Sequence, residues 1–503
     1  MVKSMDKKRS ILNVTVSVVT KLLVMVLNIL VRRFLIQYCG NEVNGLNALY
    51  LNIIGFMSVA ELGVGSAITF CMYKPIVEND MIKVSALYGL FRRLYLIIGS
   101  IILFLGLALA PWIHVFAKDY AQMNVNLSGT FILMLISVVL TYAFSSKTSL
   151  FNAHKNDYLT TAITQGGLLF QYLLQIVALR VFGTFEAYLI CRIVACLVQW
   201  IATEIVTRKK YQVIVANKQR LDICTRAEVT KNIKAMFMHN IGYALVNTLD
   251  SVVIAAFVGV VVLGEYSNYA TILASMTGLL KLIFSSLTSI VGHMFVKEER
   301  SVARKYCEAF YFLNYVIGIT FFLGYYAVIN NLINIFFGSE LVVENGIVIV
   351  ITLNGFVQFM RTSTLTFRSA TGTFYYDRWK PLVEGIVNVV FSVIFLKSLG
   401  VVGVIVATIG TNLLICHVVE PYVLYKYAFH MSPRKYYVRN YFYIVIFGAV
   451  LLLLDRFMLK MENQWASLLV NGALSLGISV IVCAVMLLFN KEAWHLVKKC
   501  KEC

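Results

Sequence analysis

The chain has 503 residues, of which 59% are hydrophobic and only 14% are charged, and its mean hydropathy is +0.78. A soluble globular domain carries far more charge, so this composition indicates a polytopic membrane protein. The net charge of +19 does not predict nucleic-acid binding. The basic residues lie in short segments between apolar spans, where they set the orientation of membrane helices.

Fourteen apolar spans are long enough to cross a bilayer. They cover residues 11–34, 46–72, 94–117, 128–148, 159–182, 185–207, 235–259, 265–291, 308–330, 344–367, 381–398, 401–425, 440–458 and 466–489. The fifth and sixth are joined only around 182–185, and the eleventh and twelfth only around 399–403. The predicted fold is therefore an all-α polytopic membrane protein with about 14 transmembrane helices.

The spans group as six, six and two, which predicts two pseudo-symmetric six-helix lobes plus two C-terminal helices. The expected domains are an N-lobe over 1–207, a cytoplasmic basic connector over 208–234, a C-lobe over 235–428, and helices 13–14 with a basic tail over 429–503. The basic residues of the connector could mark a nucleotide or headgroup site, but the positive-inside rule already explains them. A faint internal repeat relates residues 39–44 to 263–268, each with Gly four positions before Asn.

The distribution of charge tests the span count. With basic residues toward the ends of spans counted in the adjoining segment, the N-terminus, the loops after even-numbered spans and the C-terminal tail hold 34 of the 44 Lys and Arg residues, the opposite loops hold 7, and Lys21, Arg192 and Lys281 lie within spans. A missed helix would scramble this alternation. We therefore expect both termini to be cytoplasmic.

The first span combines an apolar surface with one polar seam. At about 100° per residue, its polar positions fall within roughly a 100° arc: Asn13, Ser17, Lys21, Asn28 and Arg32. Arg33 points away from this seam. A lysine near the bilayer centre costs a few kcal/mol, so it needs a wet cavity, a carboxylate partner or an anionic ligand. A water-filled pathway is the interpretation we favour, and a structural ion pair or a snorkelling lysine is the alternative.

Polar residues recur on single faces of later spans. The expected substrate cavity contains Lys21, Asn28, Arg32, Arg192, Asn240, Asn247 and Arg361. Embedded basic groups outnumber the two embedded acids, Glu61 and Asp250, which favours an anionic solute. Both acids are candidates for ion coupling, because burial raises a carboxyl pKa and lets the group load and release a cation. Neutralising a nearby cation is the alternative role, and small or hydroxyl residues can equally serve helix packing.

No motif for an enzyme or a bound cofactor is found. The sequence has no Walker A, HExxH or GxSxG pattern and no His/Asp cluster fit for a metal, so we expect a transporter with no cofactor. One CxxC at 500–503 with His495 is a weak zinc signal. The outer loops are shorter than 20 residues in this span model, which argues against a membrane glycosyltransferase or ligase.

The first hundred residues carry a resemblance. RRFLIQYCGNEVNG at 32–45, AELGVGSA at 60–67 and YKPI at 73–76 resemble the polysaccharide-transporter branch, the Wzx-type flippases, of the multidrug/oligosaccharidyl-lipid/polysaccharide (MOP) exporter superfamily. The resemblance implies alternating access between an N-lobe and a C-lobe. It also implies a lipid-diphosphate-linked oligosaccharide, usually on undecaprenol, moved from the inner to the outer leaflet.

From this resemblance we expect a flippase of the bacterial plasma membrane that serves capsule, exopolysaccharide or cell-wall synthesis. Its expected partners are the lipid-linked substrate, membrane lipids, and the polymerase and glycosyltransferases of the same pathway. A cation-coupled drug or metabolite antiporter of the same superfamily is the alternative. That branch usually has twelve spans and acidic sites, which fit this chain less well.

Overall fold

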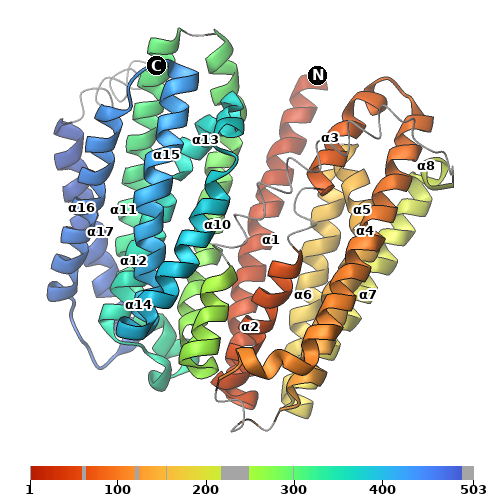
Figure 1. The fold of residues 1–503 in the computed structure, drawn as a ribbon, viewed down its shortest axis with the longest axis horizontal. Coiled ribbons are helices and arrows are strands. Elements are labelled where there is room, and N and C mark those ends of the chain that lie inside the picture. Colours follow the sequence, from red (N-terminus) through yellow and green to blue (C-terminus); the bar gives the residue numbers. More distant parts are fainter. Residues whose placement is uncertain are drawn as a thin grey trace. The chain divides into compact units, whose positions relative to one another are not determined.

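The computed structural model describes residues 2–58, 64–118, 123, 125–154, 156–216, 248–297 and 299–489. Within these residues every regular element is a helix (Figure 1). The chain forms two compact units, unit 1 (Met1–Gly264) and unit 2 (Glu265–Cys503). The division therefore follows the seventh predicted span, whereas the expected lobe boundary precedes that span. The connector beyond Ala216 lies outside the described residues.

Nine helices of the described part are long and apolar enough to cross a membrane. They are Met81–Phe116, Leu127–Ala153, Tyr158–Phe182, Phe185–Lys210, Arg300–Phe337, Asn345–Thr371, Lys380–Phe429, Arg434–Phe457 and Gln464–Leu488. The prediction of an all-α polytopic membrane protein is confirmed. The fifty-residue element Lys380–Phe429 covers two predicted spans, and it reverses direction partway along its length, at Gly400.

Unit 1 is a bundle in which α5 packs against α4 and α7, while α6 packs against α1 and α7. Its elements are α1 (Val2–Cys39), α2 (Asn41–Met57), α3 (Val64–Val77), α4 (Met81–Leu109), η2 (Ala110–Phe116), α5 (Leu127–Ala153), α6 (Asp157–Phe182), α7 (Phe185–Lys210), α8 (Gln212–Ala216) and η4 (Ile254–Val258). The N-terminus of α1 and the C-terminal end of α7 lie at the same end of this bundle (Figure 1).

The short junction between the fifth and sixth spans is made by two residues. Gly183 closes α6 in the left-handed conformation, with φ 63°, which glycine adopts without steric cost. Thr184 then caps α7, its hydroxyl accepting a hydrogen bond from the Ala187 amide. The chain therefore reverses within two residues, and α6 and α7 pack as an antiparallel pair.

Unit 2 is built around α11, which packs against α12, α13, α16 and α17. Its elements are α10 (Val260–Lys297, whose first turn belongs to unit 1), α11 (Arg300–Phe337), η5 (Ser339–Leu341), α12 (Asn345–Met360), α13 (Thr362–Thr371), η6 (Thr373–Asp377), α14 (Lys380–Thr411), η7 (Asn412–Cys416), α15 (His417–Val423), η8 (Leu424–Phe429), α16 (Arg434–Phe457) and α17 (Gln464–Phe489). Aromatic rings fill the centre: Tyr315 stacks on Tyr443 at 4.1 Å and Phe356 on Phe447 at 3.7 Å between ring centroids.

A hairpin separates the eleventh and twelfth spans at Gly400. This residue has φ 57° and ψ −137°, which is not helical and suits only glycine. Beyond it the chain runs back along itself. The Asn388 side chain donates a hydrogen bond of 2.8 Å to the Thr408 hydroxyl, and a Cβ on Gly403 would lie 2.3 Å from the Phe395 carbonyl oxygen. The two predicted spans are therefore antiparallel helices in close contact.

The first turns of α2 and α10 make a reciprocal contact. The Asn41 side-chain amide donates a hydrogen bond of 3.0 Å to the Val261 carbonyl. A Cβ on Gly45 would lie 2.0 Å from the Val260 carbonyl oxygen, and a Cβ on Gly264 would lie 2.6 Å from that of Asn41. The fifth residue of each helix thus faces the first residue of the other. This contact relates Gly45 to Gly264, whereas the repeat in the sequence relates Gly40 to Gly264, so the repeat stays a prediction.

Candidate functional site

The polar seam predicted on the first span lies on α1. Lys21, Asn28 and Arg32 are half-buried, whereas Arg33 is exposed. Lys21 and Arg32 are separated by about 16 Å along the helix axis, at 1.5 Å per residue. The side chains of α1 before residue 19, including those of Asn13 and Ser17, are outside the described part. The structure therefore places the three site candidates of this helix on positions that are neither fully buried nor fully exposed.

Arg32 and Arg192 share the same two tyrosines as electrostatic neighbours. The charge of Arg32 interacts with Tyr188 and Tyr172, and Arg192 interacts with the same two rings. The four residues come from α1, α6 and α7. We call them the Arg–Tyr cluster.

Hairpin geometry explains why the Arg–Tyr cluster forms. Arg32 lies seven residues before the end of α1 and Arg192 seven residues after the start of α7. The Cys39 thiol at the end of α1 donates to the Gly183 carbonyl, 3.6 Å away in the turn between α6 and α7. The two arginines therefore lie at similar depth in the bundle.

Buried amides hold the tyrosine side of this cluster. Gln175 is fully buried and donates a hydrogen bond of 3.1 Å to the Tyr188 carbonyl. Gln171, also buried, donates to the Gln175 side chain at 3.4 Å. These bonds fix α6 against α7 around the two rings. The cluster can present two guanidinium groups and two phenolic hydroxyls, which suit an anionic, hydroxyl-rich ligand.

Arg361 lies in a different environment, a buried ion network in unit 2. Its guanidinium donates two hydrogen bonds to Glu420, from Nε to Oε2 at 3.1 Å and from Nη2 to Oε1 at 2.6 Å. A third bond, also 2.6 Å, runs from Nη1 to the Asn412 side chain. This bidentate geometry is the strong form of an arginine–carboxylate pair. The sequence predicts Arg361 in the substrate cavity, whereas its donors here are directed at Glu420 and Asn412.

Two more cations and two more carboxylates complete this network. Lys380 contacts Glu420 at 2.6 Å and Glu384 at 2.9 Å, and Arg368 contacts Asp377. Three positive and three negative groups thus balance in the Glu420 network, which comprises Arg361, Arg368, Asp377, Lys380, Glu384 and Glu420. Burial raises the pKa of the Asp377 carboxyl, while the nearby Arg368 acts in the opposite direction.

This network corrects the sign count made from the sequence. Glu384 and Glu420 lie inside apolar spans and are 4% and 1% exposed, so Glu61 and Asp250 are not the only embedded acids. The count of embedded acids therefore omitted two carboxylates that contact Arg361. A search for every acid within a span would have found both residues. The pairing of Glu420 with Lys380, which the sequence places in a loop, depends on the hairpin at Gly400, whereas Glu384 pairs with Lys380 one turn along the same helix.

Irregular helix accompanies the network. Asn412 begins the π-helical segment η7, and Glu420 with Pro421 lies in α15 between η7 and a second π-helical segment, η8. Proline removes a backbone donor and crowds the preceding turn, and π-helical turns occur often at functional sites. Unit 2 thus carries a polar, irregular stretch of helix beside Arg361.

The other predicted residues are placed as follows. Glu61, Asn240 and Asn247 lie outside the described residues. Asp250 is half-buried in the short helix Thr248–Val258, just before the π-helical segment η4. Its role in ion coupling stays a prediction. Among the described residues no group of three or more His, Cys, Asp or Glu side chains is arranged to hold a metal ion.

Solved structures share this fold, although no protein-family model and no curated protein matches the sequence. A lipid II flippase, MurJ, in an inward closed conformation aligns with a TM-score of 0.68 and 13% identity, over 94% of this chain and 99% of that one. A multidrug resistance MATE family transporter of the MOP superfamily, in an inward-facing conformation, aligns with a TM-score of 0.57 and 12% identity, over 86% of this chain and 99% of that one. The chain therefore has the transporter fold that the MurJ lipid II flippase and this MATE transporter share.

Proposed function

We propose that this protein is a flippase that moves an anionic, lipid-diphosphate-linked oligosaccharide across a bacterial plasma membrane by alternating access. The fold is that of a lipid II flippase over nearly the whole chain. The Wzx-type branch and the polysaccharide substrate rest on the sequence motifs in residues 32–76. Both termini are cytoplasmic in this proposal, as the distribution of basic residues requires.

The observation that carries the proposal is the Arg–Tyr cluster of unit 1. Two guanidinium groups in the membrane-spanning part of a helix bundle are costly unless a ligand or water solvates them. The charges of both act on the same two tyrosines, so one anionic ligand can meet both guanidinium groups at this place in unit 1. Arginine binds phosphate oxygens bidentately, and tyrosine rings and hydroxyls suit sugars.

Unit 1 also supplies a matched test. We expect Lys21→Ala and Arg32→Ala to abolish movement of a fluorescent undecaprenyl-diphosphate sugar across reconstituted vesicles, with the protein still folded and inserted. Lys21→Arg keeps part of the activity, because charge matters more than shape in a wide cavity. Arg33→Ala, which removes the same charge one residue away on the exposed side, leaves most of the activity. If Arg33→Ala were inactive while Arg32→Ala remained active, the assignment of the substrate to the polar seam of α1 would be refuted.

The multidrug antiporter alternative has a different expected result. The fold similarity to a multidrug transporter applies to it equally. A cationic dye should then be exported by the wild type, and Arg32→Ala should leave or increase that export, because the lost guanidinium repels a cation. Export of the dye without movement of the lipid-linked sugar would replace the flippase proposal.

A further inference from the structure

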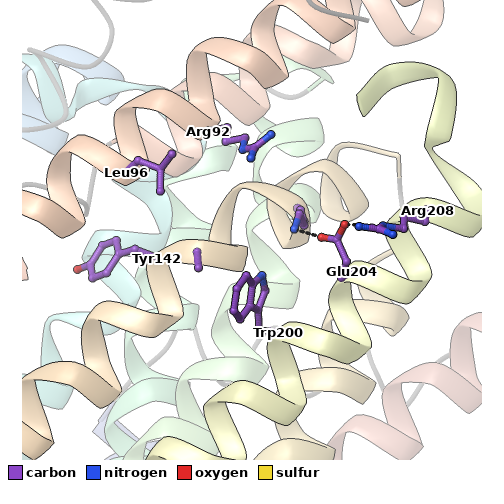
Figure 2. Close-up of a pocket in the computed structure, with 8 residues that line it drawn as sticks. Arg92, Leu96, Tyr142, Trp200, Glu204 and Arg208 are labelled. Carbon is purple, nitrogen blue, oxygen red and sulfur yellow. Dashed lines mark hydrogen bonds and ion pairs between the residues drawn. The ribbon is translucent and has the colours of Figure 1, made fainter. Parts of the chain in front are cut away.

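A cavity of about 320 Å³ lies within unit 1 among α4, α5 and α7 (Figure 2). One group of its lining residues is charged: Arg92 from α4, Lys147 from α5, and Glu204 and Arg208 from α7. Leu96, Tyr142 and Trp200 line the rest. On α7, Glu204 is twelve residues beyond Arg192, about 18 Å along the axis. The cavity is therefore separate from the Arg–Tyr cluster.

The cavity has a charged end and an apolar end. Along α4 the chain passes Arg92 first and Leu96 one turn later. α7 runs the other way, from Trp200 to Arg208. α5 runs in the same direction as α7, so it passes Tyr142 first and Lys147 afterwards. All three helices thus place their cation at one end of the cavity and their apolar side chain at the other.

The carboxylate of Glu204 orders the charged end. Glu204 Oε2 accepts a short hydrogen bond from the Lys147 ammonium, and Oε1 accepts one of 2.8 Å from Arg208 Nε. Figure 2 shows the Glu204 carboxylate facing Arg208. Lys147 is 8% exposed, whereas Arg92 and Arg208 are exposed. With three cations and one carboxylate, the charged end keeps a positive excess.

The cavity lies where the outer surface changes from apolar to basic. On α4 the exposed residues Ile97, Ile101 and Phe104 follow the cavity, and the exposed Arg93 is next to Arg92. On α7, Ile201 and Ile205 are exposed, and Lys209 follows Arg208 in the last turn. Such a boundary marks the level of lipid headgroups, and a tryptophan beside it is typical of that level.

We propose that this cavity binds the phosphate headgroup of an anionic phospholipid, with Arg92 and Arg208 contacting the phosphate and Lys147 and Glu204 forming its rigid base. The start of an acyl chain lies against Leu96 and Trp200. A lipid phosphate and a free phosphate share the charged end, but only an amphiphile uses the apolar end. The bound lipid is distinct from the transported substrate of the proposed function, and the site does not depend on that function.

The test compares two double variants of the full chain with equal loss of charge. Arg92→Gln with Arg208→Gln changes the cavity, whereas Arg93→Gln with Lys209→Gln changes its exposed neighbours at the same membrane level. Native mass spectrometry of the purified protein measures binding of phosphatidylglycerol, of phosphatidylcholine with the same acyl chains, and of inorganic phosphate. A direct hydrogen bond between charged groups contributes roughly tenfold in binding, so we expect the cavity pair to lose about 100-fold and the neighbouring pair, which does not line the cavity, much less.

Four results decide the proposal. The proposal is supported if the cavity pair alone loses phosphatidylglycerol binding, phosphatidylcholine binds weakly, and inorganic phosphate does not displace phosphatidylglycerol. Equal loss in both pairs means diffuse surface attraction and overturns it. Displacement by inorganic phosphate alone shows a simple anion site and also overturns it. If the cavity pair does not fold, Leu96→Glu places a negative charge at the apolar end and is expected to reduce phosphatidylglycerol binding; unchanged binding refutes the site.

Discussion

Glu420 is the residue on which the charge balance of unit 2 depends. Its carboxylate contacts Arg361 and Lys380, each at 2.6 Å, and Arg368 at 3.7 Å, and Glu420 is 1% exposed. Glu420→Gln keeps the shape but leaves three buried cations with two carboxylates. Removing one partner of a buried pair costs about 3–5 kcal/mol, because the remaining charge has neither a counter-ion nor water.

We expect a large loss of thermal stability from this single change. At about 2–4 °C per kcal/mol for domains of this size, the apparent Tm in detergent should fall by roughly 10 °C. A thiol-reactive fluorescent dye measures it directly, since the free Cys307 is buried in the same unit. Glu340→Gln, which removes an exposed acid of unit 2, is the control and should leave Tm unchanged.

Restoring neutrality should recover much of the loss. In the double variant Glu420→Gln with Lys380→Met, two cations remain with two carboxylates, so the combined change should cost less than the sum of the single changes. Two results would refute the interpretation of these residues as one charge-balanced network. In one, the loss of stability in the double variant equals the sum of the two single losses; in the other, Glu420→Gln is as stable as the wild type.

Two further predictions concern glycines. Gly400→Ala should lower the apparent Tm, because a residue with a Cβ is strained by about 1–3 kcal/mol at this φ and ψ. Gly410→Ala, with open space around the added Cβ, should leave Tm unchanged or raise it. A larger loss of Tm in Gly410→Ala than in Gly400→Ala would contradict the hairpin. Gly45→Ala should reduce both Tm and transport, because its Cβ would lie 2.0 Å from the Val260 carbonyl oxygen. Gly55→Ala on the same helix, where the added Cβ makes only an ordinary contact, should reduce neither. Equal effects of the two variants would argue against the close contact between α2 and α10.

The features that follow from local chemistry were predictable from the sequence. Long apolar segments must form helices in a bilayer, because the backbone has no water to bond with, so the all-α fold follows from the length and composition of the spans alone. The turns at Gly183 and Gly400 were also indicated, since glycine permits the φ values that end a helix. The seam of Lys21, Asn28 and Arg32 followed from helical periodicity.

Tertiary structure decided which charges neutralise each other. Arg361 and Arg192 look alike in the sequence, each a lone arginine in an apolar span. The hairpin at Gly400 brings Lys380 and Glu420, forty residues apart, to 2.6 Å, and the return of the chain places Glu420 on Arg361. Arg192 is placed beside Tyr172 and Tyr188 instead. Periodicity describes one helix at a time, whereas an ion pair depends on which helices are neighbours, and that is set by packing across the whole unit.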